Sequence, residues 1–398
     1  MTTPATSITA PVGNSNYPTQ FRIGCGRIRE LAAACVDFGF THPMVVTDPG
    51  IAKLPWFDAL VRSLAAGGLV PTVWHEVDPN PSETNVDAGV AAYRSGGHDG
   101  LVLVGGGSAI DTGKCIALLA NNPGTVFDYE DIGDNYKRAD PAKIVRSIAV
   151  PTTAGTGSEV GRASVIVDPR DHGKKIIFHA KMQPALVIAD PELTYGLPPG
   201  LTAATGMDAL AHCFEAYCAP GYHPMADGIA LEGMRIIHAN IRVAVREGTN
   251  AVARTNMLMA STMGATAFQK GLGLVHALSH PLGGATGLHH GTANAIFMPY
   301  VMVFNRAEIA AKMNHLARVL DLPAAASGFD ACMDWMLALR KDLGLPHTLA
   351  GVPGVSEELL RSLVPLAAAD PSMGGNPRPA THADLEAVFL DALHGQLL

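Results

Sequence analysis

Hydrophobic positions along the chain follow two rhythms, and the change between them divides the chain into two parts. From about residue 21 to 190, short runs rich in β-branched residues alternate with helical patterns. The runs predicted as strands are PMVVTD (43–48), TVWHEV (72–77), GLVLVGGG (100–107), RSIAVPTT (146–153) and ALVIADP (185–191). This alternation predicts a largely parallel sheet covered by helices.

After LPPG (197–200) the β pattern fades, and Ala, Leu and Met recur at helical spacing. The predicted helices are 201–219, 224–245, 251–268, 306–320, 328–343 and 355–368. We therefore expect a loose arm over residues 1–20, an α/β domain over 21–195 and an all-α domain over 196–398. Ligands of open α/β folds bind at the carboxyl ends of the strands, so the expected active site is the cleft where the helical part faces those ends.

Composition narrows the classes of function. A length of 398 residues allows sizeable cores, and 48% hydrophobic with 16% charged residues is ordinary for a globular enzyme. A net charge of −8 argues against nucleic acid as a partner. No apolar run reaches the roughly 18 residues of a membrane span, the first 20 residues resemble no targeting signal, and the six cysteines form no CxxC pair. We expect a cytoplasmic protein with no membrane partner.

One strand-to-helix turn carries three consecutive glycines. In GLVLVGGGSAIDTGK (100–114) these glycines let a phosphate approach the backbone, and Ser108 and the free N–H groups of the helix start can hold its charge. The stretch is not a P-loop, because Cys115 stands where Ser or Thr should follow the lysine, and it is not GxGxxG, because Ile110 occupies the third glycine position. The turn predicts a phosphate site, and a tight turn without a ligand is the alternative.

A second turn repeats this chemistry. PTTAGTGSEVGR (151–162) follows another predicted strand and gathers small hydroxyl residues around two glycines. Asp48 ends the strand PMVVTD, where a carboxylate can accept hydrogen bonds from a ribose and repel a 2′-phosphate, which favours NAD over NADP. It precedes the glycines, whereas the acidic residue of the usual order follows them by about 20 residues, so we expect a different topology. An ordinary turn residue is the other interpretation of Asp48.

Metal-ligating residue types gather in the helical part. In TGMDALAHCFEAY (205–217), Asp208 and His212 are four residues apart and share one helix face. His276 and His280 repeat that spacing, and Pro281 limits how far their stretch can continue as regular helix. One carboxylate with several imidazoles suits a divalent first-row metal that keeps a position open for substrate.

Together the motifs GGGSAIDTGK, PTTAGTGSE, TGMDALAH, GLGLVHALSHPLGG and HHGTANA resemble the iron-containing (group III) alcohol dehydrogenases, which have the dehydroquinate synthase-like fold. The similarity runs from QFRIGCG (20–26) to NPRP (376–379). The resemblance implies an α/β nucleotide-binding domain followed by an all-α metal-binding domain. It implies four metal ligands, Asp208, His212, His276 and His290. It places His280 beside substrate and nicotinamide as the catalytic residue, and no role is assigned to His289.

The same resemblance implies which residues contact NAD. These are Asp48, Asn80, Gly106, Gly107, Ser108, Asp111, Thr152, Thr153, Thr156 and Lys175. The basic pair Lys174-Lys175 leaves the lysine ambiguous by one residue, and Gly161 stands where many relatives carry a hydroxyl residue.

These observations predict an NAD-dependent, metal-dependent alcohol dehydrogenase that interconverts a small, primary or secondary, alcohol and its aldehyde or ketone. The metal acts as a Lewis acid on the substrate oxygen, and the nicotinamide takes the hydride. Fe(II) is the expected ion and Zn(II) the alternative. We expect a homodimer or larger homo-oligomer. The alternatives are a lyase or synthase of the same fold that uses NAD transiently, a metal-dependent hydrolase, and a silent nucleotide-binding protein.

The substrate is predicted only as a class. By resemblance, the segments that contain Arg162, Ala267 and Lys270 border the cavity between metal and nicotinamide. A cation there would hold a carboxylate and favour a hydroxy acid over a neutral alcohol. The alternative is that each cation forms a salt bridge at the domain interface or contacts the cofactor phosphate.

Overall fold

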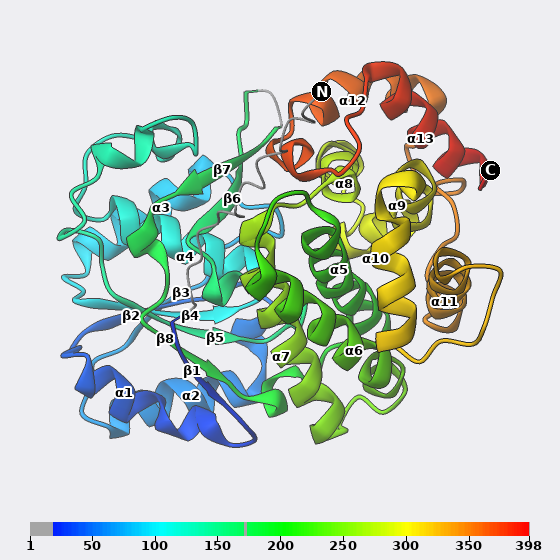
Figure 1. Cartoon of the computed structure of the whole chain (residues 1–398). Helices are drawn as coiled ribbons and strands as arrows, with labels where there is room; N and C mark the ends of the chain where they lie inside the picture. Colours follow the sequence, from blue (N-terminus) through cyan, green and yellow to red (C-terminus); the bar gives the residue numbers. More distant parts are fainter. Residues whose placement is uncertain (1–18, 171–172, 398) are drawn as a thin grey trace, which may run out of the picture.

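The first half of the chain builds one parallel sheet (Figure 1). The structure, a computed structural model, describes residues 19–170 and 173–397. In this part of the chain the six strands of the sheet have the order β1-β8-β5-β4-β2-β3, and every neighbouring pair is parallel. The strands are β1 (Gln20–Ile23), β2 (Pro43–Val46), β3 (Thr72–Trp74), β4 (Gly100–Gly105), β5 (Ser147–Pro151) and β8 (Leu186–Ala189). Five of them lie within the predicted runs, and β1 is additional.

Each face of the sheet is covered by a helical layer, because successive strand residues point to opposite faces. In β4, Leu101 and Leu103 belong to the core beneath one layer, and Val102 and Val104 to the core beneath the other. The first layer contains α3 (Glu83–Ser95) and α4 (Gly107–Leu119), and the second contains α1 (Leu31–Asp37) and α2 (Pro55–Ala66) (Figure 1). Burial on both faces explains the uninterrupted apolar runs of the sequence.

The order of the strands brings Asp48 to the glycine turn. The chain runs from β2 outward to β3 and then crosses back to β4, which pairs with the other edge of β2. Such a reversal opens a crevice at the carboxyl ends of the strands. A Cβ placed on Gly105 would lie 3.7 Å from Oδ2 of Asp48, so the acidic residue lies beside glycines that follow it by more than fifty positions in the sequence.

A hairpin that the sequence analysis did not predict follows the second turn. Its strands are β6 (Ala163–Val167) and β7 (Lys174–Phe178), which pair antiparallel and form a separate two-stranded sheet. Figure 1 shows this hairpin reaching along the border between the sheet and the helical half. One face of the hairpin is therefore available to line a site between the two halves.

The second half is helical, and no strand follows β8 within the described residues. Its helices are α5 (Pro199–Cys218), α6 (Pro224–Arg246), α7 (Ala251–Ala267), α8 (Leu274–Thr286), α9 (His290–Phe304), α10 (Arg306–Val319), α11 (Gly328–Asp342), α12 (Glu357–Ala369) and α13 (His382–His394). They share one continuous apolar core. None of the described helices is both long and apolar enough to span a membrane.

Six of these helices match predicted segments, whereas α8, α9 and α13 were not predicted. Pro281 lies inside α8, so the expectation that it limits the regular helix is wrong. Short 3-10 turns complete the described chain: Arg27–Glu30, Ile51–Lys53, Val126–Tyr129, Asn135–Arg138, Ser158–Val160, Ala180–Met182, Pro191–Thr194 (η7), Phe268–Lys270 and Pro371–Gly375 (η9).

Candidate metal and nucleotide site

A cavity of about 1080 Å³ lies where the helical half faces the carboxyl ends of the strands. Its wall includes residues that directly follow β2, β4 and β5, one face of the hairpin, and residues of α5, α8 and α9. Most of the predicted site residues line it: Asp48, Asn80, Gly106, Gly107, Ser108, Asp111, Thr152, Thr153, Thr156, Arg162, Asp208, His212, His276, His280 and His290. The fold thus gathers residues from both halves of the sequence around one space.

The two glycine-containing turns interlock at the sheet end of this cavity. A Cβ on Gly106 would lie 3.1 Å from Oγ1 of Thr153, and a Cβ on Gly107 would lie 2.7 Å from Cγ2 of Thr156. Glycine is required here partly because the second turn packs against the first. Helix α4 begins at Gly107 without a side-chain cap, and the N–H groups of its first turn can therefore attract an anion to the positive end of the helix.

Some polar side chains of this wall are already engaged by the protein. The Ser108 hydroxyl donates to the carbonyl of Pro79 (2.6 Å), and Oδ2 of Asp111 accepts from the amide of Val165 (3.0 Å). Oδ1 of Asp111 forms an ion pair with the buried ammonium of Lys114 (3.0 Å). Asp111 therefore tethers α4 to β6, although it lines the cavity.

Asp48 combines a turn contact with a place on the cavity wall. Its Oδ1 accepts from the amides of Gly50 (2.8 Å) and Ile51 (2.9 Å), as in the turn interpretation. Within the described chain, no hydrogen bond engages Oδ2, the oxygen nearer the glycine turn. The carboxylate can close the turn with one oxygen and accept a ribose hydroxyl with the other.

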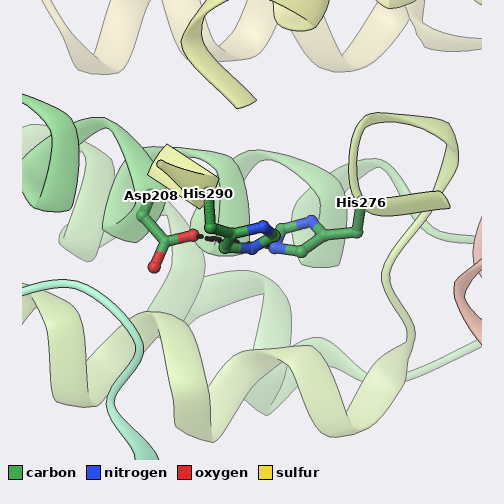
Figure 2. A group of neighbouring side chains, drawn as sticks. All are labelled: Asp208, His276 and His290. Carbon is green, nitrogen blue, oxygen red and sulfur yellow. Dashed lines mark ion pairs between the residues drawn. The ribbon is translucent and has the colours of Figure 1, made fainter. Parts of the chain in front are cut away.

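At the opposite end of the cavity, Asp208, His276 and His290 point toward one another (Figure 2). Oδ1 of Asp208 lies 3.4 Å from Nε2 of His290 and 3.8 Å from Nε2 of His276. Nε2 of His212 is also 3.8 Å from this oxygen. Donors around a tetrahedral ion with bonds of about 2.1 Å are about 3.4 Å apart, so Asp208, His276 and His290, whose donor atoms all lie within 4.8 Å of one another, fit a divalent metal. His212 lies outside this group, although its Nε2 approaches Oδ1 of Asp208.

The residues come together because two helices approach closely. Asp208 and His212 are one turn apart on α5, and His290 begins α9. A Cβ on Gly291 would lie 2.0 Å from the carbonyl oxygen of Ala204, so only glycine permits this approach of α9 to α5.

Two buried residues hold the side chains of this cluster in place. The Glu215 carboxylate contacts Nδ1 of His276 with one oxygen and accepts from the amide of Val275 (2.7 Å) with the other. Nδ2 of Asn294 donates to Oδ1 of Asp208 (2.8 Å) and lies 3.2 Å from Nε2 of His290. A carboxylate on the far nitrogen of a metal-binding imidazole fixes the ring and makes it a better ligand.

The environment of the cluster shifts its pKa values in a direction that suits a cation. Burial alone would raise the pKa of Asp208, but the imidazoles of His212 and His290 outweigh this and hold it well below its usual range. Burial lowers the pKa of His212 to about 4 and that of His290 well below its ordinary value. Burial opposes protonation of His276 as well, but Glu215 and Asp208 raise its pKa to about 9. A metal would take the place of this last proton.

His280 lines the cavity between the cluster and the C-terminal segment. Its ring stacks on that of His290, with centroids 5.2 Å apart and planes 15° apart. Its Nδ1 lies 2.8 Å from Oδ2 of Asp370, a residue 90 positions further along the chain. His289 also lines the cavity.

The hairpin decides the ambiguity between the two neighbouring lysines. Strand residues alternate between faces, and Lys174, Ile176 and Phe178 of β7 line the cavity. Lys175 lies on the opposite face of β7 and is not among the residues that line the cavity. Of the two lysines, Lys174 therefore lies on the cavity wall, and the NAD contact itself stays a prediction.

Two of the predicted substrate residues lie outside the cavity wall, whereas Arg162 lies on it. The Lys270 ammonium is buried in an ion pair with Asp227 (2.5 Å), a salt bridge within the helical half and not at the domain interface. Ala267 is fully buried at the end of α7 and is also not among the lining residues. The Arg162 guanidinium lies over the ring of Phe178, 5.6 Å from its centroid.

Comparison with known proteins identifies the fold and its chemistry. The family model for iron-containing alcohol dehydrogenase matches residues 18–191, and the model for the C-terminal part of the Fe-containing alcohol dehydrogenase family matches residues 202–393. This chain belongs to the iron-containing alcohol dehydrogenase family. The predicted family, the fold class and the assignment as an oxidoreductase are confirmed.

Relatives of this iron-containing alcohol dehydrogenase cover nearly its whole length. The 4-hydroxybutyrate dehydrogenase of Cupriavidus necator is 42% identical over 379 residues, which are 92% of this chain and 96% of the relative. A crystal structure of 1,3-propanediol oxidoreductase matches with a TM-score of 0.89 and 33% identity, covering 94% of this chain and 98% of the other. The sulfoacetaldehyde reductase of Bifidobacterium kashiwanohense, solved in complex with NAD+, matches with a TM-score of 0.88 and 29% identity, covering 97% of this chain and all (100%) of the other.

Proposed function

We propose that this enzyme interconverts a small hydroxy acid and the corresponding aldehyde-bearing carboxylic acid, with NAD as hydride acceptor. A divalent metal would be held by Asp208, His212, His276 and His290. The observation that carries the proposal is the single cavity that joins the glycine turns to the Asp/His cluster. Fe(II) is the proposed ion, in keeping with the family, and Zn(II) fits the same donors.

Each wall of the cavity has its own task in this proposal. The N–H groups at the start of α4 and the hydroxyls of Thr152 and Thr153 bind the cofactor phosphates, and Asp48 accepts from a ribose. The bound metal supplies Lewis-acid polarisation of the substrate oxygen, and NAD supplies the hydride acceptor. His280 lies beside the cluster, where its imidazole can take the hydroxyl proton.

A cation on the cavity wall supports an anionic substrate, although aspartates outnumber the lysine and arginine side chains along the wall as a whole. Among the described residues, Arg162 and Lys174 are the Lys and Arg side chains that line it. Burial lowers the pKa of Lys174, and the carboxylates of Asp208, Asp111 and Asp370 oppose this lowering, so its ammonium group lies within the field of carboxylates at both ends of the cavity. Phe178, beneath Arg162, is four strand residues from Lys174, or roughly 13 Å. Of the two cations, Lys174 is the one within reach of the carboxylate of a short hydroxy acid.

The similarity to a 4-hydroxybutyrate dehydrogenase suggests the first substrate pair to test. We expect kcat/KM for 4-hydroxybutyrate to exceed that for 1-butanol by about 10- to 100-fold, the size of one charge-assisted hydrogen bond. Lys174→Ala should remove this difference and leave 1-butanol oxidation unchanged. Lys175→Ala, on the other face of the same strand, is the matched control and should keep the difference.

Other outcomes would change the assignment. Equal efficiency on both substrates in the unaltered enzyme would contradict the hydroxy-acid proposal and leave a broad alcohol dehydrogenase. An equal loss of kcat/KM on both substrates in Lys174→Ala would show that this lysine binds the cofactor instead of the substrate carboxylate. If Arg162→Ala alone removed the difference, the carboxylate would bind at that end of the hairpin. A reaction without net NADH formation would favour the lyase or hydrolase alternatives.

We also propose that the enzyme acts in the cytoplasm as a homodimer or larger homo-oligomer. The six cysteines of the sequence support a reducing compartment, because all of them are free thiols and five are buried. Light scattering of the purified chain measures the assembly, and a monomer at all concentrations would contradict the second part.

A further inference from the structure

A carboxylate from the C-terminal part of the chain reaches the cavity beside His280. Asp370 follows α12 and starts the turn η9. Its Oδ1 accepts from the amide of Ser372 (2.8 Å), and its Oδ2 lies 2.8 Å from Nδ1 of His280. Only 6% of the Asp370 side chain and 12% of the His280 side chain are exposed, so the pair is shielded from competing water. The next two residues, Pro371 and Ser372, line the cavity.

This contact selects one tautomer of His280. An ionised carboxylate only accepts hydrogen bonds, so Nδ1 must carry the hydrogen that it donates to Asp370. In the neutral ring Nε2 is then the basic nitrogen. Within the described chain no hydrogen bond engages Nε2 of His280. Stacking on His290 holds the plane of the ring, and the Asp370 contact fixes its rotation within that plane.

We propose that Asp370 is the positioning residue for proton transfer: it holds His280 with a basic Nε2 directed at the substrate hydroxyl. This inference rests on the proposed function. In the oxidation, the carbinol C–H bond breaks and its hydride passes to NAD. The hydroxyl proton passes to Nε2, and the hydrogen on Nδ1 stays on the ring. The resulting imidazolium lies against the Asp370 carboxylate until Nε2 returns its proton to water in the cavity.

The decisive variant is Asp370→Asn, which keeps the shape and the turn cap but can donate to Nδ1 and so favour the other tautomer. We expect kcat to fall about 10²-fold, the lower end of the contribution of a general base, with KM, NAD affinity and metal content unchanged. Asp370→Glu should recover part of the rate, because it restores an acceptor. In a His280→Ala enzyme, Asp370→Asn should cause no further loss, because the two side chains act as one unit.

A matched control separates positioning from loss of the cap. Asp190 also precedes a proline, is buried, and starts the turn η7 by accepting from the amide of Glu192 (3.0 Å), but it contacts the amide of Ile28 instead of a histidine. Asp190→Asn should leave kcat unchanged in the folded protein. An equal rate loss in both variants would show that Asp370 has only a structural role.

The tautomer can be measured without turnover. In the Zn(II)-loaded enzyme with ¹⁵N-labelled histidine, the His280 signals, assigned by their absence in His280→Ala, should show a protonated Nδ1. In Asp370→Asn the proton should move to Nε2. A protonated Nε2 in the unaltered neutral ring would overturn the inference. If instead the tautomer is as proposed but no alcohol yields NADH, the proposed function fails while the geometric claim stands.

Discussion

The nucleotide wall and the metal wall of the cavity differ in the origin of their residues. The nucleotide wall consists of backbone and small side chains that directly follow β4 and β5 on adjacent strands. The metal wall consists of ionisable side chains from α5, α8 and α9, held by partners such as Glu215 and Asn294. The first wall is specified by short stretches of sequence, and the second by contacts between distant ones. Variants should therefore affect the two walls separately.

The largest difference between the effects on metal binding and on NAD binding is expected for the proposed metal ligands. His276→Ala or His290→Ala should abolish both metal retention and turnover, because each removes a donor from a cluster with few alternatives, while NAD binding remains. Elemental analysis and NAD titration of the same preparation measure both. His289→Ala is the neighbouring control and should retain metal. Full metal and activity in His290→Ala would exclude this residue as a ligand.

A smaller effect on metal is expected from the supporting carboxylate. Glu215→Gln should weaken metal binding about 10- to 100-fold, as loss of the partner of a metal-binding imidazole does. Competition with a chromogenic chelator measures the affinity. Glu159 is a second buried glutamate, hydrogen-bonded to Thr262 instead of a ligand, so Glu159→Gln should leave the affinity unchanged. Equal weakening in both variants would point to general destabilisation.

On the nucleotide wall, the interlocked turns predict a change in NAD affinity and none in metal binding. Gly107→Ala places a Cβ 2.7 Å from Thr156, so the turns must separate, and the Kd for NAD should rise about tenfold while metal content stays constant. Gly228→Ala, a helical position with open space around its Cβ, is the control. Metal loss in Gly107→Ala would show that the walls are not independent.

The smallest effect is expected at the ribose. Asp48→Ala should relax the preference for NAD over NADP by a few fold, because it removes one charge that repels the 2′-phosphate. Kinetics with both cofactors measure the ratio. Use of both cofactors by the unaltered enzyme would show that Asp48 serves the turn alone.

The same contrast explains how far the sequence alone leads. Five strands of the sheet were predictable because buried parallel strands give local apolar runs, whereas the edge strand β1 is not fully buried and gives no such run. The N-terminus of α8 was not predictable, because its first backbone amides donate to Asn376 and Glu215, which lie far away in the sequence. Likewise, Pro299 is tolerated inside α9, where Arg340 donates to the carbonyl that the missing N–H leaves free, that of Ala295 (3.3 Å).

Within the candidate site, motif residues were accessible to sequence analysis and their supports were not. Nothing local connects Asp370 to His280 or Asn294 to Asp208, since these pairs form only when helices from different segments pack. The β6–β7 hairpin did leave a signal, because ASVIV and KKIIF are short runs rich in β-branched residues. The two-residue strand period places Lys174 and Lys175 on opposite faces, and only the packing of the hairpin shows that Lys174 faces the cavity.

The central claim is that one cavity joins a nucleotide wall to a metal wall for alcohol oxidation. The most direct test is NADH formation from 4-hydroxybutyrate by the same enzyme before metal removal, after it, and after reconstitution with Fe(II), with NAD binding measured in each state. We predict NAD binding in all three states and NADH formation only when the metal is present. An undiminished rate in the metal-free enzyme, or loss of NAD binding together with the metal, would contradict the account.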